Sequence, residues 1–382
     1  MTTSKQPSTH RKKGDPISST LENHRIIIDE IDRQLLDLIN RRLSVAKKIG
    51  QIKGRQKTMI IDTKRETEVL QKLLNLNRDG QLTHDSLFQI FSAIIAASRE
   101  IQQPQMQMSA ACPVPALFAV IGSPVSHSMS PRMHSCAFSA TGYNGLYLPL
   151  EISDIEQAVS GLKALNFKGA SITIPHKESI ADYLDEVDDL ARRIGAVNTV
   201  VNTHGGLIGY NTDCSGAMWA LTDCTSIKDR QVAIIGAGGA ARAIGFGVKT
   251  EGGRITIFNR SAEKGETLAG DLDATFMPLA EVRNIECDIL INTTPVGMTP
   301  HVDDTCVPGE VLDKHMVVMD VVYNPIKTRL LREAEIAGCS TIDGLSMFVY
   351  QGAGQFKLWT GSEAPVEMMR MAVLAGLNAA DD

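Results

Sequence analysis

The chain has 382 residues, and its 38 lysines and arginines stand against 44 aspartates and glutamates, for a formal net charge of −6. This length predicts two or three domains, and the acidic balance argues against a general nucleic-acid-binding protein. No apolar run approaches the length of a membrane span. The seven cysteines are widely spaced without a Cys-x-x-Cys motif, which predicts reduced thiols in a cytosolic protein and no metal site.

The N-terminal hundred residues predict a tail followed by three helices. Residues 1–20 are polar and contain a short basic cluster, which predicts a disordered tail, with a transit peptide as the alternative. From residue 21 to about 54, apolar residues recur at helical spacing. A helix of this length favours packing against a partner helix or a second chain. Two more helices are expected over 62–77 and 83–103.

After a proline-containing linker over residues 104–116, short apolar runs alternate with helical patterns. This alternation predicts α/β domains built on parallel sheets. The expected strands cover residues 118–122, 170–174, 197–201, 231–236, 254–259, 288–294 and 316–322.

The segment 231–242 places a G-x-G-x-x-A turn directly after an apolar strand. Gly236 suits the tight turn, and Gly238 allows backbone amides to approach a pyrophosphate. The next strand, over residues 254–259, is followed directly by Arg260, where NAD enzymes tend to carry an acidic residue, so the sequence predicts binding of the NADP 2′-phosphate. The expected cofactor-binding residues are Gly236, Ala237, Gly238, Gly239, Ala240, Asn259, Arg260, Ser261 and Lys264.

Four polar clusters lie at or near the ends of predicted strands, at residues 126–131, 171–177, 195–199 and 209–213. Each cluster alone is typical of a turn. In this order, ahead of the dinucleotide loop, they resemble the shikimate dehydrogenase family, and the resemblance covers about residues 117–378. It extends through the segments Asp320–Pro325 and Gly344–Gln351.

The resemblance implies NADP-dependent interconversion of 3-dehydroshikimate and shikimate. It implies a shikimate-binding α/β domain over 117–213, completed by 344–382, and a Rossmann NADP domain over 214–343. A hydride delivered to a ketone leaves an alkoxide, which needs a positioned proton donor. By resemblance, Lys177 and Asp213 are the catalytic pair, and the substrate ligands are Ser128, Ser130, Thr173, Asn198 and Gln351. Ser171 stands where family members often have Asn, which leaves quinate open as a substrate.

Residues 21–103 carry charged and polar side chains on all three predicted helices. Arg25 lies seventeen residues before Arg42, about 25 Å along a helix axis, so one helix cannot bring both into one small pocket. This segment resembles the small all-helical chorismate mutases, whose site positions here are Arg25, Arg42, Lys53, Asp62, Arg65, Glu66, Ser98 and Gln102.

That second resemblance implies a three-helix domain that forms an intertwined homodimer and rearranges chorismate to prephenate. Arg25 would then act in the partner's site. The alternative is a regulatory domain that senses chorismate or prephenate and serves as a dimerisation module.

Overall fold

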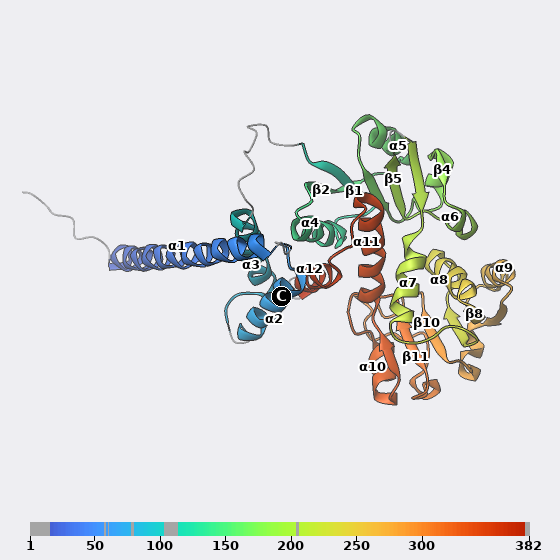
Figure 1. Cartoon of the computed structure of the whole chain (residues 1–382). Helices are drawn as coiled ribbons and strands as arrows, with labels where there is room; N and C mark the ends of the chain where they lie inside the picture. The colour runs from blue at the N-terminus through green and yellow to red at the C-terminus, as the bar shows by residue number, and fades with distance from the viewer. Residues whose placement is uncertain are drawn as a thin grey trace, which may run out of the picture. The chain divides into compact units, whose positions relative to one another are not determined.

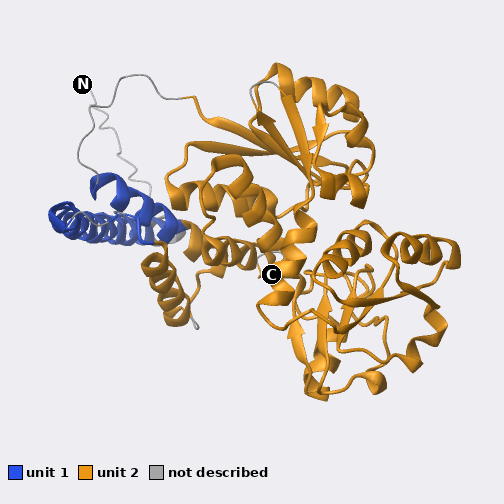
Figure 2. Ribbon diagram, turned by 45° about the vertical axis from the view of Figure 1, so that its right-hand side comes forward, with its two compact units in different colours: residues 1–62, 90–108 blue, residues 63–89, 109–382 orange. Residues whose placement is uncertain are grey.

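A computed structural model describes residues 16–56, 59, 61–77, 80–102, 114–203 and 206–378. The chain divides into two compact units, one of residues 1–62 and 90–108 and the other of residues 63–89 and 109–382. Figure 2 colours the two units separately. The predicted tail up to residue 15 and the linker from 104 to 113 lie outside the described residues.

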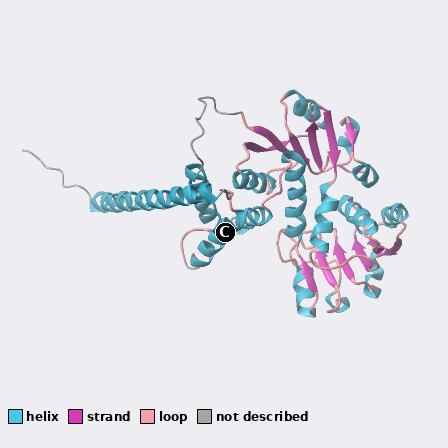
Figure 3. Cartoon of the chain, viewed as in Figure 1, coloured by secondary structure: helices cyan, strands magenta, loops and turns pink. Residues whose placement is uncertain are grey.

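Three helices open the described chain: α1 (Pro16–Gln56), α2 (Thr63–Leu76) and α3 (His84–Gln102). They confirm the three helices expected from the apolar spacing (Figures 1 and 3). Helix α1 begins within the predicted tail, at Pro16, because a proline in the first helical turn loses no backbone hydrogen bond. Of the helices that the structure describes, none is long and apolar enough to cross a membrane.

Helix α1 carries an exposed row of large apolar side chains. Every residue from 21 to 38 is exposed. Further along, Gly50 allows close approach of α3, since a Cβ there would lie 2.8 Å from the Cα of Gln102. The apolar residues of α1 that are 44–61% exposed are Leu21, Ile26, Ile27, Ile28, Ile31, Leu35, Leu36, Leu38, Val45, Ile49 and Ile52.

The first sheet has the strand order β2-β1-β3-β5-β6-β4. Its strands are β1 (Ala116–Gly122), β2 (Gly145–Glu151), β3 (Gly169–Ile172), β4 (Glu186–Val187), β5 (Thr199–Thr203) and β6 (Gly206–Tyr210). The accompanying helices are α4 (Ser130–Thr141), α5 (Ile155–Ala164) and α6 (Asp189–Ile194), with a 3₁₀ turn at Ser179–Tyr183.

The predicted parallel pairing holds for only part of this first sheet, in which β1 pairs parallel with β2 and β3, and β4 with β6. Strand β5 runs antiparallel to both β3 and β6. Only two residues separate the end of β5 at Thr203 from the start of β6 at Gly206. So short a connection can join antiparallel strands but not parallel ones, which need a crossover.

The second sheet is parallel throughout, with the order β12-β11-β10-β7-β8-β9 of a dinucleotide-binding fold. Its strands are β7 (Gln231–Ile235), β8 (Arg254–Asn259), β9 (Thr275–Pro278), β10 (Ile289–Asn292), β11 (Val317–Asp320) and β12 (Ser340–Ile342). Helices α8 (Gly239–Thr250), α9 (Ala262–Leu272) and α10 (Arg329–Ala337) accompany it, with 3₁₀ turns at Leu279–Asn284 and Gly309–Val311.

Two helices, α7 (Thr212–Thr222) and α11 (Gly344–Thr360), lie side by side between the two sheets, and α12 (Val366–Asn378) ends the described chain (Figure 1). Gly216 makes this approach possible, because a Cβ there would lie 2.5 Å from the backbone nitrogen of Gln351. The first half of α7 and the middle of α11 therefore lie in close contact.

A buried carboxylate, Asp320, organises the carboxyl ends of β10 and β11. Its Oδ1 accepts hydrogen bonds from Asn292 Nδ2 at 3.0 Å and from the Val322 backbone nitrogen at 3.0 Å. Its Oδ2 accepts one from Thr328 Oγ1 at 2.7 Å. Burial raises the pKa of Asp320 to about 6, although these three hydrogen bonds act to lower it.

We predict that Asp320 makes stability fall as the pH rises from about 4 to about 6. The unfolded chain loses this proton near pH 3.8 and the folded chain near pH 6, so ionisation in the fold costs about 3 kcal/mol above pH 6. Asp320→Asn keeps the shape and removes the titration. Urea unfolding should show the variant gaining stability relative to wild type between pH 4 and pH 7. If the free energies of unfolding of variant and wild type differed by the same amount at pH 4 and at pH 7, the prediction would be contradicted.

Candidate active site

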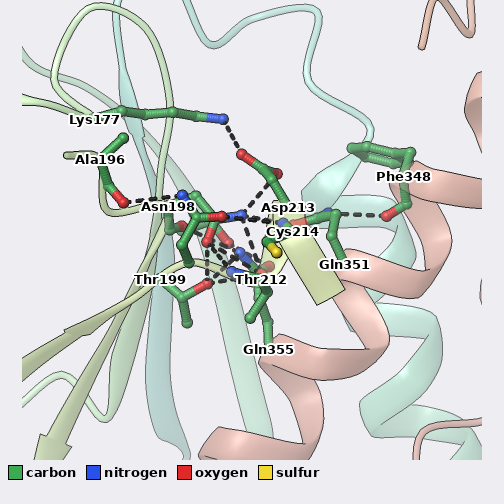
Figure 4. A network of polar contacts seen from close by, with 12 residues as sticks. Lys177, Ala196, Asn198, Thr199, Thr212, Asp213, Cys214, Phe348, Gln351 and Gln355 are labelled. Carbon is green, nitrogen blue, oxygen red and sulfur yellow. Dashed lines mark hydrogen bonds and ion pairs between the residues drawn. The ribbon is translucent and has the colours of Figure 1, made fainter. Parts of the chain in front are cut away.

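The amine of Lys177 and the carboxylate of Asp213 form a close ion pair, with Nζ 2.6 Å from Oδ2 (Figure 4). Lys177 follows β3, and Asp213 lies in the first turn of α7. The positive end of a helix dipole stabilises a carboxylate at that position. The two side chains are 32% and 16% exposed, so the pair is shielded yet open to a small molecule.

Asn198 is hydrogen bonded to two residues in the first turn of α7, Asp213 and Thr212. Its Nδ2 donates to Asp213 Oδ1 at 2.8 Å, and its Oδ1 accepts from the Thr212 backbone nitrogen at 2.7 Å. The same Nδ2 lies 3.4 Å from Gln351 Oε1, and Gln351 Nε2 donates to the Phe348 carbonyl at 2.9 Å. Figure 4 shows these side chains converging from Asn198 just before β5, from α7 and from α11. The network fixes the orientation of the Asp213 carboxylate.

A cavity of about 580 Å³ lies over this network. Ser128 and Ser130 line it from the loop before α4 and from the first residue of α4, where backbone N–H groups favour an anion. Thr173 lines it from the end of β3, and Gly122 leaves room for the threonine because a Cβ there would clash with its side chain. The structure thus brings all seven residues predicted for shikimate chemistry to one cavity, namely Ser128, Ser130, Thr173, Lys177, Asn198, Asp213 and Gln351.

The cavity also contains residues that the sequence analysis missed. Gln355 lies one helical turn after Gln351 on α11, and that spacing was the available signal. Tyr323 lies within the segment Asp320–Pro325, and its ring stacks on Phe348 with a centroid distance of 4.9 Å. His127 and Met298 also line the cavity.

Two residues in and just after β3, Ser171 and His176, form hydrogen bonds within the fold. His176 is 5% exposed, and its Nε2 lies 2.7 Å from the Ile152 carbonyl oxygen. It therefore packs against the backbone and does not line the cavity. Ser171, the residue that departs from the family pattern, is also buried, and its hydroxyl donates to Gln355 Oε1 at 2.8 Å.

The glycine-rich turn has the geometry that a dinucleotide requires. Gly236 adopts a φ of +114°, a conformation that favours glycine. A Cβ at Gly238 or Gly239 would meet no atom within 4 Å, so the space above the turn is open. A second cavity of about 490 Å³ is lined by Ala237, Gly238, Gly239 and Lys264, among others. Ala240 lines the first cavity, so the turn connects the two.

The residues expected to bind the 2′-phosphate lie at the carboxyl end of β8. Arg260 and Ser261 are exposed there, and Asn259 Nδ2 donates to the Ser261 carbonyl at 2.8 Å. Helix α9 starts directly after Ser261, so its N-terminal N–H groups point toward the same region. An exposed cation beside a helix N-terminus fits a phosphate and does not favour the neutral ribose hydroxyl of NAD.

The residues expected in a chorismate site lie on α1, α2 and α3, or, for Asp62, just before α2. Arg42 donates hydrogen bonds to Ser98 Oγ and to the Ile94 carbonyl, which ties α1 to α3 within the first unit. Gln102 belongs to the same unit, and its Oε1 is buried without a hydrogen-bond partner among the described residues. The remaining members of the set are Arg25, Lys53 and Asp62 in the first unit and Arg65 and Glu66 in the second.

Arg25 lies on the same continuous helix as Arg42, which confirms the geometry expected from the sequence. Its side chain is 65% exposed, and Nη1 lies 3.5 Å from Glu22 Oε2 one turn earlier. A straight helix of this rise separates the two arginines by about 25 Å. Within its own chain, Arg25 therefore cannot join Arg42 at a small ligand.

No group of three histidine, cysteine, aspartate or glutamate side chains placed to hold a metal ion occurs among the described residues. Six of the seven cysteines fall in the described part of the chain, and all six are free thiols.

Four family models match separate segments of the chain. The model for chorismate mutase type II matches residues 24–103, and the shikimate dehydrogenase substrate binding domain matches residues 120–200. The shikimate/quinate 5-dehydrogenase model matches residues 219–323, and the shikimate 5′-dehydrogenase C-terminal domain matches residues 344–374.

Individual proteins agree with these matches. Shikimate dehydrogenase (NADP(+)) of Methanosarcina acetivorans is 45% identical over 278 residues, which cover 69% of this chain and 99% of that protein. The Thermus thermophilus shikimate 5-dehydrogenase solved with NADP(H) and shikimate is 35% identical, with a TM-score of 0.64 over 68% of this chain and 99% of that one.

A chorismate mutase/shikimate 5-dehydrogenase fusion protein from Clostridium acetobutylicum is 30% identical, with a TM-score of 0.64 over 67% of this chain and 96% of that one. Fold, cavity and relatives agree along the α/β part of the chain, and a separate family model covers the helices before it. The chain belongs to the shikimate dehydrogenase family, and the model for chorismate mutase type II matches its N-terminal helical segment, residues 24–103.

Proposed function

We propose that the chain is a bifunctional enzyme of aromatic amino-acid biosynthesis, an NADP-dependent shikimate dehydrogenase joined to a chorismate mutase. The observation that carries the first activity is the Lys177–Asp213 pair at 2.6 Å inside the cavity beside the dinucleotide turn. An isolated ion pair is a common structural feature. This one lies among hydroxyl and amide groups that suit a polyhydroxylated carboxylic acid.

The polar groups of the cavity divide into an anion-binding part and a hydroxyl-binding part. Ser128 and Ser130 at the start of α4 suit the shikimate carboxylate, because hydroxyls and helix N–H groups both donate hydrogen bonds. Thr173, Asn198 and Gln351 suit the ring hydroxyls and the carbonyl, since they offer both donors and acceptors. The substrate ring would then lie against Lys177 and Asp213.

The Lys177–Asp213 pair would hold the proton of the reacting oxygen. NADP, when bound, supplies the acceptor or donor of the hydride at the reacting carbon. During oxidation the substrate hydroxyl gives its proton to the pair, and during reduction the pair returns it to the alkoxide oxygen. Asn198 holds Asp213 Oδ1 from behind, so Oδ2 stays directed at Lys177 throughout.

For the helical segment we propose chorismate mutase activity in a homodimer. Chorismate is a dianion that rearranges without proton transfer or a nucleophile, so cations and hydrogen-bond donors suffice. Arg42 and Arg65, with Arg25 from the partner, would bind the carboxylates, and Lys53 and Gln102 the ether oxygen. Glu66 would accept from the ring hydroxyl. The contact of Arg42 with Ser98 supports a role for this face of α1.

The exposed apolar row on α1 supports the homodimer. Eleven large apolar side chains of that helix are 44–61% exposed, more than a single surface helix usually leaves in water. A second copy of α1 would bury them and would also deliver Arg25. The helical segment as a sensor of chorismate or prephenate remains the alternative, as does quinate as a substrate of the dehydrogenase.

The domain limits of the proposal are those expected from the sequence, namely 21–103 for the mutase, 117–213 with 344–382 for shikimate binding, and 214–343 for NADP. We propose a cytosolic location, which the six free thiols support.

The first prediction for this function concerns cofactor choice. Arg260→Asp should weaken NADP binding by about 2–3 kcal/mol, because a charge-assisted contact becomes a repulsive one, and should leave NAD binding nearly unchanged. Fluorescence titration with both cofactors measures this. Arg254→Asp, at the opposite end of the same strand, is the control and should alter neither affinity. Equal weakening of NADP and NAD by Arg260→Asp would exclude a 2′-phosphate contact.

The second prediction separates the two activities. Lys177→Ala should lower kcat for shikimate-dependent NADP reduction about 10²–10⁴-fold, because the proton transfer loses its positioned group. NADP affinity and chorismate consumption should not change. Lys163→Ala removes an exposed ion pair of similar length, 2.9 Å to Asp185, and should leave both activities intact. Parallel loss of both activities in Lys177→Ala would show that the variant is misfolded or that the sites are shared.

The third prediction tests the composite mutase site. Arg25→Ala and Arg42→Ala should each cost the mutase about 3–5 kcal/mol of transition-state stabilisation. When the two inactive variants exchange subunits, half of the dimers are mixed and each mixed dimer has one intact site. Activity should therefore rise to about one quarter of wild type.

The control for the loss of an arginine from α1 is Arg33→Ala, which removes an exposed arginine that pairs with Glu30 at 2.7 Å. It should retain activity alone and in mixtures. A mixture of the Arg25 and Arg42 variants that stays inactive, although mass spectrometry detects mixed dimers, would show that Arg25 acts within its own chain.

A further inference from the structure

A row of buried polar side chains lies behind the dehydrogenase cavity. It consists of His134 on α4, Tyr147 on β2, Ser171 on β3 and Gln355 on α11, which are 0%, 4%, 6% and 1% exposed. Ser171 and Gln355 line the cavity, whereas His134 and Tyr147 do not. Buried polar groups of this kind constrain one another, because each donor hydrogen must be directed at one of the few acceptors within reach.

The amide of Gln355 has a fixed orientation. Its Nε2 donates to the Asn198 carbonyl at 3.2 Å and to Thr199 Oγ1 at 3.1 Å. The reversed amide would place two oxygens against each other at Asn198. Gln355 Oε1 therefore faces Ser171 and His134, and it can only accept hydrogen bonds.

His134 donates one hydrogen bond to Gln355 Oε1, and its imidazole ring stays neutral. Burial lowers the pKa of His134 to about 3, although the hydrogen bond to Gln355 acts to raise it. Its Nε2 lies 3.1 Å from Gln355 Oε1, so the single imidazole proton resides on Nε2. The ring also stacks on Tyr147 with a centroid distance of 4.7 Å and an interplanar angle of 14°.

Ser171 has one hydrogen and two lone pairs to distribute. The hydrogen is donated to Gln355 Oε1 at 2.8 Å. One lone pair accepts the Tyr147 hydroxyl hydrogen at 2.6 Å. Because Ser171 lines the cavity, the second lone pair is the hydrogen-bonding capacity left for a substrate.

Tyr147 is a dependable donor in this arrangement. Burial raises its pKa, although hydrogen bonds with Ser171 and Ser130 act to lower it, so the phenol keeps its hydrogen. The contact with Ser130 also connects the row to the residue expected at the substrate carboxylate. Tyr147 therefore links two points of the substrate site from a position outside the cavity.

We propose that Tyr147 is a specificity-determining positioning residue of the dehydrogenase, which holds the Ser171 hydrogen on Gln355 so that Ser171 offers the substrate a lone pair only. Ser171 then accepts from a ring hydroxyl that does not react, and it disfavours a carbonyl or ether oxygen at that point. An asparagine at this position would offer a donor as well. The inference rests on the proposed dehydrogenase function.

The test compares Tyr147→Phe, Ser171→Ala and the double variant in full-length protein. The substrates are shikimate and two analogues that each lack one non-reacting ring hydroxyl. Wild type should discriminate strongly against one analogue. Tyr147→Phe should raise KM for shikimate about fivefold to twentyfold with kcat changed less than about twofold, and it should weaken that discrimination. The double variant should be no worse than Ser171→Ala, because Tyr147 acts through Ser171.

Tyr143→Phe is the matched control, since Tyr143 packs against the same apolar cluster that contains Tyr147, with its ring 5.4 Å from that of Phe138. It should leave KM and discrimination unchanged. The proposal would be overturned if the increase in KM for the double variant equalled the product of the increases for the two single variants. Unchanged discrimination in Ser171→Ala would also overturn it, even if Tyr147→Phe did not fold. A wild-type protein inactive on shikimate would instead refute the proposed function.

Discussion

The candidate dehydrogenase site depends on the close packing of α7 against α11. Asp213 stands in the first turn of α7, and Gln351 and Gln355 stand on α11, so neither helix alone contains the site. Gly216 sets the distance between the helices, because any side chain there would meet the Gln351 backbone. Asn198 then connects both helices to β5, and the ion pair of Lys177 with Asp213 is held in place from three elements.

The antiparallel strand β5 also has a functional consequence. It brings Asn198, which immediately precedes the strand, next to the end of β3 and the start of α7. In a wholly parallel sheet the residue before a strand would lie at the opposite edge from the carboxyl ends that bear the ligands. The reversal of β5 therefore allows a residue at its amino end to share a site with Thr173 and Lys177 at the carboxyl end of β3.

Features that depend on local sequence could be predicted, and those that depend on tertiary packing could not. The strand ending at Asn259 has the predicted limits, and the glycine turn predicted at Gly236 forms, with a φ of +114° at that residue. Tyr147 gave no signal, since a tyrosine in a short strand is ordinary. Its importance comes from a hydrogen bond to a residue 24 positions away in sequence. The orientation of β5 was also missed, because apolar content predicts a strand but not its direction.

The helical segment has two separate requirements that a single partner helix could meet. Its apolar side chains on α1 are exposed and would be covered by a partner, and the site proposed here would need Arg25, which the same helix places about 25 Å from Arg42. A partner helix lying along α1 would meet both needs at once, because the covered stripe includes the turns around Arg25. Stability and catalysis would then share one interface, so a chain that lost the interface would lose the site with it. Such a dependence favours an obligate dimer over a transient one, since no isolated chain would hold a complete site.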